Sequence, residues 1–294
     1  MCSERKNLGK LVLIGAGRVG PALAKAFRDK GYNIVAVLSR SLESAKRCAE
    51  LCSCPLAITD PAHIPKADVV LICVPDDAIG EVVDKLRRLR VVHKDSVVIH
   101  TSGAVSSDVL SPLRELGADV ASLHPIQSIT GPESDLRGVY FGIEGDEKAL
   151  SQVRRLIEEL GGVPLEIPKE EKSVYHLACT IASNYLVTLL HVADQIFRGL
   201  GLQPEGAFRV LKPLIEGTLA NVEKMGVEEA LTGPISRGDV GTARRHLEVL
   251  KEKFPHLVPF YVTLGRLTTE MAQSRGSIDR KKVTALERLF KSFT

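Results

Sequence analysis

The feature that most limits the fold of this chain is a change of pattern at Pro168. Before this residue, short β-branched apolar runs alternate with amphipathic stretches, and after it only helical patterns follow. Such alternation is typical of a parallel sheet with crossover helices. The expected strands are Leu11–Ile14, Ile34–Leu38, Val69–Val74, Ser96–Ile99, Val120–Leu123, Tyr140–Ile143 and Val163–Ile167. We therefore predict an α/β chain with a doubly wound parallel sheet in residues 1–168 and an all-helical domain in residues 169–294.

The helical part opens with a long segment from Lys172 to Leu200. Its apolar residues recur at intervals of three or four, as on one buried helix face. This row consists of Val174, Ala178, Ile181, Tyr185, Leu189, Val192 and Ile196. Such a helix exceeds the diameter of a small domain, so we expect it to support the second domain or to bridge subunits. Further helices are expected at residues 205–225, 242–253, 258–271 and 281–291.

Composition argues against several function classes. The 294 residues suit two domains, and 39 basic against 36 acidic residues leave a formal charge of only +3. Nucleic-acid binding needs dense basic patches or stacking aromatics, and this chain has no Trp and 4% aromatics. No unbroken apolar run of about 18 residues and no signal peptide are apparent, so we expect a cytoplasmic protein without a membrane partner.

Three cysteines, Cys48, Cys52 and Cys54, lie close together in the sequence. A metal site would need a fourth ligand at suitable spacing, and only His63 is near. Because free cysteines usually behave as small apolar residues, we interpret these as structural thiols and predict no metal site.

The most specific motif is LVLIGAGRVG, in which a strand pattern leads into glycines at positions 15, 17 and 20 and then into a helix. Gly15 permits a tight turn, Gly17 lets a diphosphate approach the backbone, and Gly20 lets helix and strand pack closely. The free N–H groups of the helix N-terminus would bind the anion. This context predicts a dinucleotide-binding site.

The end of the second strand indicates which dinucleotide is bound. NAD sites usually place a carboxylate here, whereas this chain has Ser39, Arg40 and Ser41. The Arg40 guanidinium could pair with a 2′-phosphate, so we predict NADP as the cofactor. The alternative is that Ser41 is a helix N-cap and Arg40 a solvated surface residue.

Polar residues also follow the later strands, at the edge of a parallel sheet where ligands bind. Val74 and Pro75 are expected to flank the nicotinamide ribose, and Thr101 and Ser102 to line the pocket, whereas Asp76 or Asp77 could be a helix N-cap. The predicted cofactor-binding residues are Gly15, Ala16, Gly17, Arg18, Val19, Gly20, Ser39, Arg40, Ser41, Cys73, Val74, Pro75, Asp76, Thr101, Ser102 and Gly103.

His124 follows another strand and is the first candidate for proton transfer, since its ordinary pKa is near neutrality and Pro125 stiffens the turn. A hydrogen-bonded structural histidine would explain it equally well. On the long helix His176, Thr180 and Asn184 form a polar line, with Ser183 beside it. We predict His124, His176, Ser183 and Asn184 as catalytic and Thr180 as substrate-binding. Ordinary solvent exposure is the alternative for the helix line.

The segment from Leu231 to Leu247, LTGPISRGDVGTARRHL, contains two glycine-bearing turns. Arg237 in this segment could bind a substrate carboxylate through two parallel hydrogen bonds, and we predict it as substrate-binding. The alternative is an interhelical turn in which Arg237 pairs with Asp239.

Taken in order, LVLIGAGRVG, SRS, CVPDDAI, HTSGAV, HPIQSI, YHLACTIASNYLVTLL and LTGPISRGDVGTARRHL resemble the Rossmann-like proteins with the domain of unknown function 2520. These are relatives of pyrroline-5-carboxylate reductase, prephenate dehydrogenase and the β-hydroxyacid dehydrogenases. The resemblance implies an NADP-binding Rossmann domain, a helical domain that forms a homodimer, and an active site between domains. The β-hydroxyacid dehydrogenases have a catalytic Lys four residues before an Asn. Asn184 matches that Asn, whereas Thr180 replaces the Lys.

Together these features predict an NADP-dependent oxidoreductase that transfers a hydride to or from a small anionic carbonyl, imine or hydroxy substrate. The alternative is an NADP-binding sensor or regulator without turnover, which the Thr180 replacement favours. An S-adenosylmethionine methyltransferase fits less well, because such sites commonly place an acid where Ser39 stands.

Overall fold

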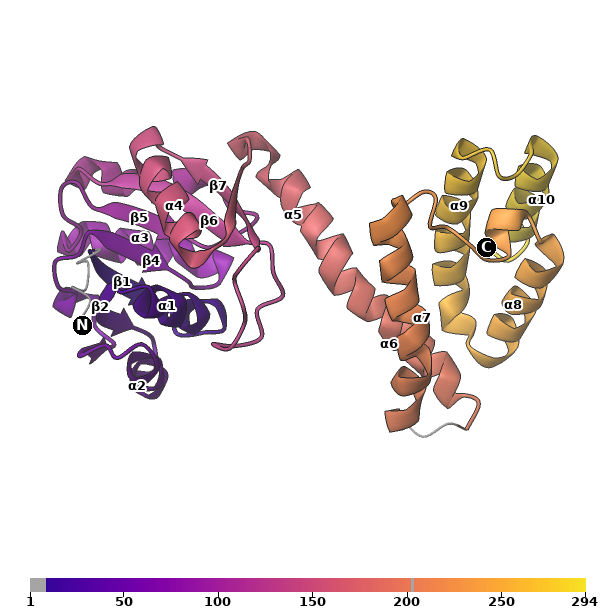
Figure 1. The fold of residues 1–294 in the computed structure, drawn as a ribbon, viewed down its shortest axis with the longest axis horizontal. Helices are drawn as coiled ribbons and strands as arrows, with labels where there is room; N and C mark the ends of the chain where they lie inside the picture. Colours follow the sequence, from indigo (N-terminus) through magenta and orange to yellow (C-terminus); the bar gives the residue numbers. More distant parts are fainter. Residues whose placement is uncertain (1–8, 202–203) are drawn as a thin grey trace. The chain divides into compact units, whose positions relative to one another are not determined.

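The computed structural model describes residues 9–201 and 204–294. The chain divides into two compact units, Met1–Leu186 and Val187–Thr294, so the division between units falls inside the long helical segment (Figure 1). The domain boundary that we expect at residue 168 stays a prediction.

The described residues of the first unit form an eight-stranded sheet in the order β3-β2-β1-β4-β5-β6-β7-β8. Its strands are β1 Lys10–Ile14, β2 Asn33–Leu38, β3 Ala57–Ile58, β4 Val69–Ile72, β5 Val97–His100, β6 Asp119–Pro125, β7 Tyr140–Gly145 and β8 Val163–Glu166. The doubly wound α/β fold is therefore confirmed, with the strand order reversing between β1 and β4. Strand β3 escaped prediction because two residues are too few to form a pattern.

One strand pair differs from the predicted parallel sheet. Strand β7 pairs antiparallel with β6, and His124 lies opposite Gly142 in that pairing. The connection from Ile126 to Val139 contains no helix, so the chain does not make the crossover that a parallel pair requires. Strand β8 then pairs parallel with β7 after a helical crossover.

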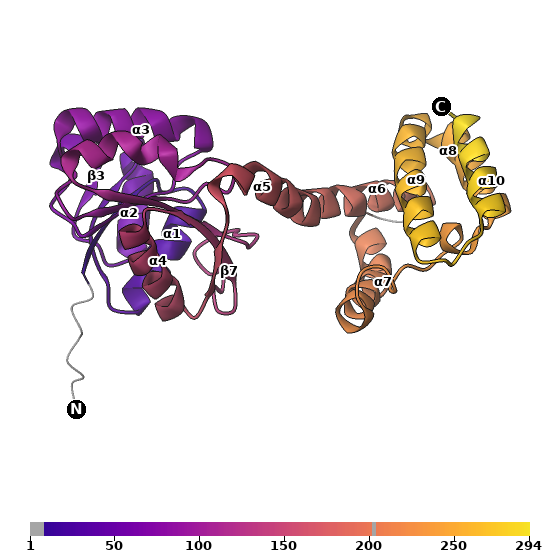
Figure 2. The same ribbon diagram turned by 90° about the horizontal axis from the view of Figure 1, so that it is seen from above.

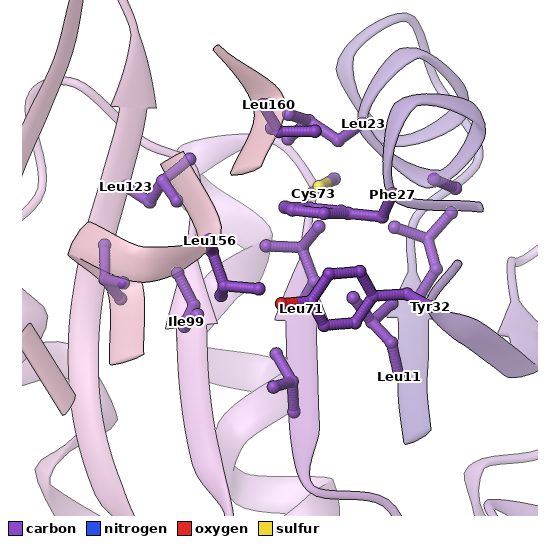
Figure 3. Close-up of a cluster of buried hydrophobic side chains, with 14 of the residues drawn as sticks. Leu11, Leu23, Phe27, Tyr32, Leu71, Cys73, Ile99, Leu123, Leu156 and Leu160 are labelled. Carbon is purple, nitrogen blue, oxygen red and sulfur yellow. The ribbon is translucent and has the colours of Figure 1, made fainter. Parts of the chain in front are cut away.

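Both faces of the sheet are covered by helical segments. Helices α1 (Val19–Asp29), α2 (Leu42–Leu51) and α4 (Glu147–Leu160) lie on one face, and α3 (Asp76–Leu89) lies on the other with the 3₁₀ segment η2 (Ser107–Leu116) (Figure 2). Side chains of β1 alternate between the two apolar cores, because successive residues of a strand point to opposite faces. Leu11, Phe27 and Leu156 belong to the core in Figure 3. An apolar core therefore covers each face of the sheet around its central strands.

The predicted long helix is present but irregular. It consists of α5 (Lys172–Thr180), a π-helical turn η4 (Ile181–Tyr185) and α6 (Leu186–Arg198), and it is preceded by the 3₁₀ turn η3 (Lys169–Glu171). By length and composition alone, Lys169–Arg198 could span a membrane, since an 18-residue window has a mean hydropathy of 1.3. Polar residues interrupt the apolar runs of this segment, so a search for unbroken apolar runs does not find it.

The apolar row of this helix is not the buried face that its spacing predicts. Val174, Ile181 and Tyr185 are 62%, 52% and 56% exposed. Only the end of the row meets a core, where Val192 and Ile196 pack against the apolar cluster of the second unit. The spacing of apolar residues identifies a helix face that some contact shields from water. This single chain does not bury most of the row.

The second unit is helical throughout its described residues, as predicted. It contains α7 (Pro204–Met225), α8 (Val240–Lys253), α9 (Val258–Ser274) and α10 (Arg280–Lys291), with the 3₁₀ turns η5 (Ile235–Arg237) and η6 (Pro255–Leu257). Leu247, Leu286 and Phe290 are buried in its core. Gly265 of α9 provides room for Phe290, because a Cβ atom there would lie 2.6 Å from the ring.

Candidate functional site

The glycine loop after β1 has the geometry that its spacing predicts. Gly15 has φ +104°, and a Cβ atom there would lie 2.3 Å from the carbonyl oxygen of Cys73. A Cβ atom on Gly20 would lie 2.1 Å from the Gly15 carbonyl oxygen. Gly17 instead faces open space, with nothing within 4 Å of a Cβ position. Two glycines therefore permit close packing, and the third leaves room for a ligand.

Helix α1 begins directly after this loop, at Val19, and no described side chain caps its N-terminus. Its first turn also lacks an acidic residue. The N–H groups of that turn are thus available to an anion, and no neighbouring carboxylate in the turn opposes it. The open space at Gly17 and this helix end together fit a diphosphate group.

A cavity of about 430 Å³ extends from the glycine loop to the end of β2. Its lining includes Ser39, Arg40 and Ser41, as predicted, and also Ser44 and Lys85, which the sequence reading missed. Arg40 is exposed, while Ser41 caps α2 by accepting a hydrogen bond from the Ser44 amide at 3.3 Å. The capping alternative for Ser41 is therefore confirmed, and capping does not remove Ser41 from the cavity wall.

Glu81 also lines this first cavity, where its carboxylate pairs with the Lys85 ammonium at 2.6 Å. The Lys85 charge lowers the pKa of Glu81. This pair lies on α3, across the cavity from the end of β2.

A second cavity, of about 470 Å³, shares Gly17, Cys73, Val74 and Pro75 with the first. Its other lining residues follow β1, β4 or β5, lie at the end of β6 or after it, or lie on α5: Arg18, Val19, Asp76, Thr101, Ser102, Gly103, His124, Pro125, Gln127, Ile129 and His176. Every predicted cofactor-binding residue except Gly20 therefore lines one of the two adjoining cavities.

The prediction that Asp76 or Asp77 caps a helix is wrong. Helix α3 begins at Asp76, its N-cap residue is Pro75, and no described side chain caps it. The two carboxylates lie in the first turn instead, where the helix dipole favours negative charge.

His124 combines the two roles that its position suggests, a structural hydrogen bond and a place in the cavity wall. Its Nδ1 lies 2.6 Å from the Tyr175 hydroxyl oxygen, and its ring stands edge-on to that of His176, with centroids 5.7 Å apart. Burial, the neighbouring His176 and the Lys172 charge lower the pKa of His124 to about 4. Burial also raises the pKa of Tyr175, so His124 is neutral and Tyr175 protonated at pH 7.

Two glycines make room for these rings. A Cβ atom on Gly142, opposite His124 in the sheet, would lie 2.5 Å from the Tyr175 hydroxyl oxygen. A Cβ atom on Gly103 would lie 2.5 Å from His176 Cδ2 and 2.9 Å from His124 Nε2. Gly103 therefore lies directly against the edges of both imidazoles, at the wall of the second cavity.

Comparison with known proteins agrees with this geometry. A Rossmann-like domain model matches residues 3–125, and a model of a domain of unknown function, DUF2520, matches residues 139–268. A solved structure of a protein from Thermotoga maritima is 30% identical and covers 90% of this chain and 99% of its own, with a TM-score of 0.70. This chain belongs to the Rossmann-like, DUF2520 family.

A candidate NADP oxidoreductase from Bacteroides fragilis is 25% identical over 89% of this chain and 98% of its own, with a TM-score of 0.76. The imine reductase from Myxococcus stipitatus, solved in complex with NADP⁺, shares the fold at 18% identity and a TM-score of 0.65, covering 95% of this chain and 99% of its own. No curated protein matches the sequence.

Three predicted residues of this DUF2520 chain lie further along the long helix. Thr180 is half-buried, Ser183 and Asn184 are exposed, and none of the three lines either cavity. Of the helix residues predicted as functional, only His176 joins the cavity wall. The roles of the other three stay predictions.

Arg237 belongs to the second unit, where its side chain is exposed and its carbonyl accepts a hydrogen bond from Lys282 Nζ at 2.8 Å. Asp239 caps α8 by accepting hydrogen bonds from the Thr242 amide and hydroxyl. Asp239 is therefore engaged by the helix end, and substrate binding by Arg237 stays a prediction.

The sequence reading missed Lys172, Tyr175 and Gly142. The signal was present, because Lys172, Tyr175 and His176 are spaced i, i+3 and i+4 and so share one face of α5. The neighbouring apolar row was predicted to be the buried face of the helix instead.

Cys48 and Cys52 are buried in the core of the first unit, and the Cys52 thiol donates to the Cys48 carbonyl at 3.1 Å. Within residues 9–201 and 204–294, no group of three or more His, Cys, Asp or Glu side chains could hold a metal ion.

Proposed function

We propose that this chain is an NADP-dependent oxidoreductase that transfers a hydride between the nicotinamide and a small anionic carbonyl, imine or hydroxy compound. The observation that carries the proposal is the continuity of the glycine loop with a second cavity whose wall holds neutral His124 paired to Tyr175. The match to the candidate NADP oxidoreductase of Bacteroides fragilis supports it.

The chain's own residues would divide the binding task. The loop from Gly15 to Gly20 and the first turn of α1 hold the diphosphate, and Ser39 and Arg40 hold the 2′-phosphate. The bound cofactor supplies or accepts the hydride at the nicotinamide ring.

His124 would act as the hydrogen-bond donor to the reacting group. In the tautomer in which the protonated Tyr175 hydroxyl donates to Nδ1, the imidazole proton is on Nε2, which lies 2.9 Å from the Cβ position of Gly103 at the cavity wall. A neutral donor of this kind polarises a carbonyl or imine.

Arg18 is the group at the second cavity that would favour an anionic substrate. It lines the cavity and could pair with a substrate carboxylate, whereas the charge of the buried Lys172 is already paired with Glu144. Asp76 is the carboxylate among the residues that line the cavity, and it lies in the first turn of α3.

We propose further that the chain acts in the cytoplasm as a homodimer, with neither nucleic acid nor membrane as a partner. The homodimer is supported by the exposed apolar row of the long helix, which includes Val174, Ile181 and Tyr185. A second copy of the same helix would remove these side chains from water.

Oxidation of NADPH, followed by absorbance against a panel of keto acids and cyclic imines, tests the reaction. We expect turnover with at least one anionic member of the panel, and a loss of about 10²-fold or more in kcat for His124→Ala with NADPH affinity retained. Tight NADPH binding without turnover across the panel would favour the alternative, a sensor, which Thr180 at the position of the related catalytic Lys supports.

A further inference from the structure

A row of buried polar residues crosses three neighbouring strands beneath the first turn of α5. His100 of β5 pairs with Ser122 of β6, and Ser122 pairs with Glu144 of β7. All three are 6% exposed or less. Residues that pair across strands project from the same face of a sheet, so the row presents an imidazole, a hydroxyl and a carboxylate to one side.

Lys172, the first residue of α5, covers this row and is 3% exposed. Its Nζ donates to the Ser102 carbonyl at 3.1 Å and to the Ser122 hydroxyl, and it lies 3.6 Å from Glu144 Oε1. Two of the three ammonium protons are thus donated to oxygen atoms, and the Glu144 carboxylate lies at ion-pair distance from the same nitrogen.

Glu144 is held from its other side as well. Its carboxylate accepts hydrogen bonds from the Ser107 amide at 2.7 Å and the Ser107 hydroxyl at 2.6 Å. Each member of the buried pair of Lys172 and Glu144 therefore has hydrogen bonds to other groups, which is the condition under which a buried ion pair is tolerated.

The partners of Lys172 adjoin the second cavity directly. Ser102 precedes Gly103, whose backbone lies against both imidazole edges, and the Ser102 amide donates to His100 Nδ1 at 3.2 Å. Ser122 lies two residues before His124 and so shares its face of β6. One ammonium thus ties together the two segments that carry Gly103 and His124.

We propose that Lys172 is a positioning residue of the second cavity. Its ammonium fixes the Ser102 carbonyl and the Ser122 hydroxyl, and through them the places of Gly103 and His124. The inference rests on the proposed function only in treating this cavity as the substrate pocket.

The charge of Lys172 also acts on the neighbouring histidines, which an apolar side chain at this position would not do. The Lys172 charge contributes to lowering the pKa of His100 to about 3 and that of His124 to about 4, in each case after burial. The groups around His124 are Tyr175, His176 and Lys172 from α5, His100 from β5, Glu144 from β7, and Arg18 and Asp76 at the cavity wall. Among them Lys172 is the buried cation.

The test is an NMR titration of the histidine rings in the full chain without cofactor. In Lys172→Met the pKa of His124 should rise by about one unit, because a nearby positive charge is lost. The double variant Lys172→Met with Glu144→Gln removes both charges together and gives a second sample if the single variant does not fold. Lys172→Arg keeps the charge and should restore the low pKa.

Lys169→Met is the matched control. Lys169 is 48% exposed in its side chain and pairs with Asp108 at 2.8 Å, so its loss should leave the His124 titration unchanged. An unchanged His124 titration in Lys172→Met and in the double variant would overturn the proposal, as would an equal change in Lys169→Met. Calorimetry with NADPH on the same samples tests the proposed function separately, since the titration needs neither cofactor nor turnover.

Discussion

The contact between Gly142 and Tyr175 gives the sharpest test of the His124 arrangement. In Gly142→Ala the new Cβ atom would lie 2.5 Å from the Tyr175 hydroxyl oxygen and 2.7 Å from the ring carbon that bears it, well inside van der Waals contact. The backbone of Gly142 does not lie in the left-handed region, so the substitution tests this overlap and not backbone strain. Tyr175 must move, and its hydrogen bond to His124 must break.

Overpacking of this kind costs about 1–3 kcal/mol, and for a unit of this size each kcal/mol lowers Tm by roughly 2–4 °C. We therefore expect Tm to fall by about 2–12 °C. We also expect kcat for NADPH oxidation to fall at least about tenfold, while the Kd for NADPH stays within about twofold, since Gly142 lines neither cavity.

The assays are thermal unfolding, steady-state kinetics and calorimetry on the same preparations. Gly80→Ala is the matched control, because Gly80 lies within α3 and nothing lies within 4 Å of its Cβ position. Alanine should leave that variant as stable as the wild type or more so. Wild-type Tm and kcat in Gly142→Ala would refute the reasoning.

Three further predictions concern cofactor choice, pH and assembly. Arg40→Ala should raise the Kd for NADPH about 10- to 100-fold and leave the Kd for NADH nearly unchanged, because a charge-assisted hydrogen bond contributes roughly 1.5–3 kcal/mol. Calorimetry measures both dissociation constants, with the exposed Arg47→Ala as the control. Folding stability should fall as pH drops from about 6.5 towards 4, because unfolded histidines bind protons that folded His100 and His124, with pKa values of about 3 and 4, do not. In urea unfolding, the loss of folding stability from pH 7 to pH 5 should be smaller in His100→Asn than in the wild type. Equal losses in the two proteins would contradict this prediction. In sedimentation experiments, the dissociation constant of the dimer should be at least about tenfold higher for Ile181→Lys and unchanged for Val249→Lys on α8. Equal dissociation constants in the two variants would argue against the long helix as the interface.

Local patterns predicted the sheet and the phosphate loop well. Each expected strand forms. The central strands are apolar runs buried on both faces, whereas β8 at the edge of the sheet is largely exposed. The glycine spacing was informative because each position has a separate steric reason, visible at Gly15, Gly17 and Gly20. The antiparallel β7 was not foreseen, since strand direction depends on the connection and not on the strand itself.

The second cavity was harder to predict. His124 could be named because it follows a strand, whereas Tyr175 and Lys172 reach the site only when α5 packs on the sheet. The sequence pattern of one segment cannot show that the residue opposite His124 in the sheet is a glycine, which leaves room for a tyrosine. The apolar row of the long helix was read correctly as a pattern, but its spacing did not indicate what buries it.

Calorimetry of NADPH against the wild type and Gly17→Val tests the proposed dinucleotide-binding loop most directly. Gly17 faces open space, so valine should fold normally while filling the volume that a diphosphate needs. We predict one saturable site per wild-type chain, an affinity at least about tenfold lower in Gly17→Val, and equal Tm values in the absence of cofactor. No binding of NADPH or NADH to the wild type, or equal affinity in the two proteins, would contradict the account.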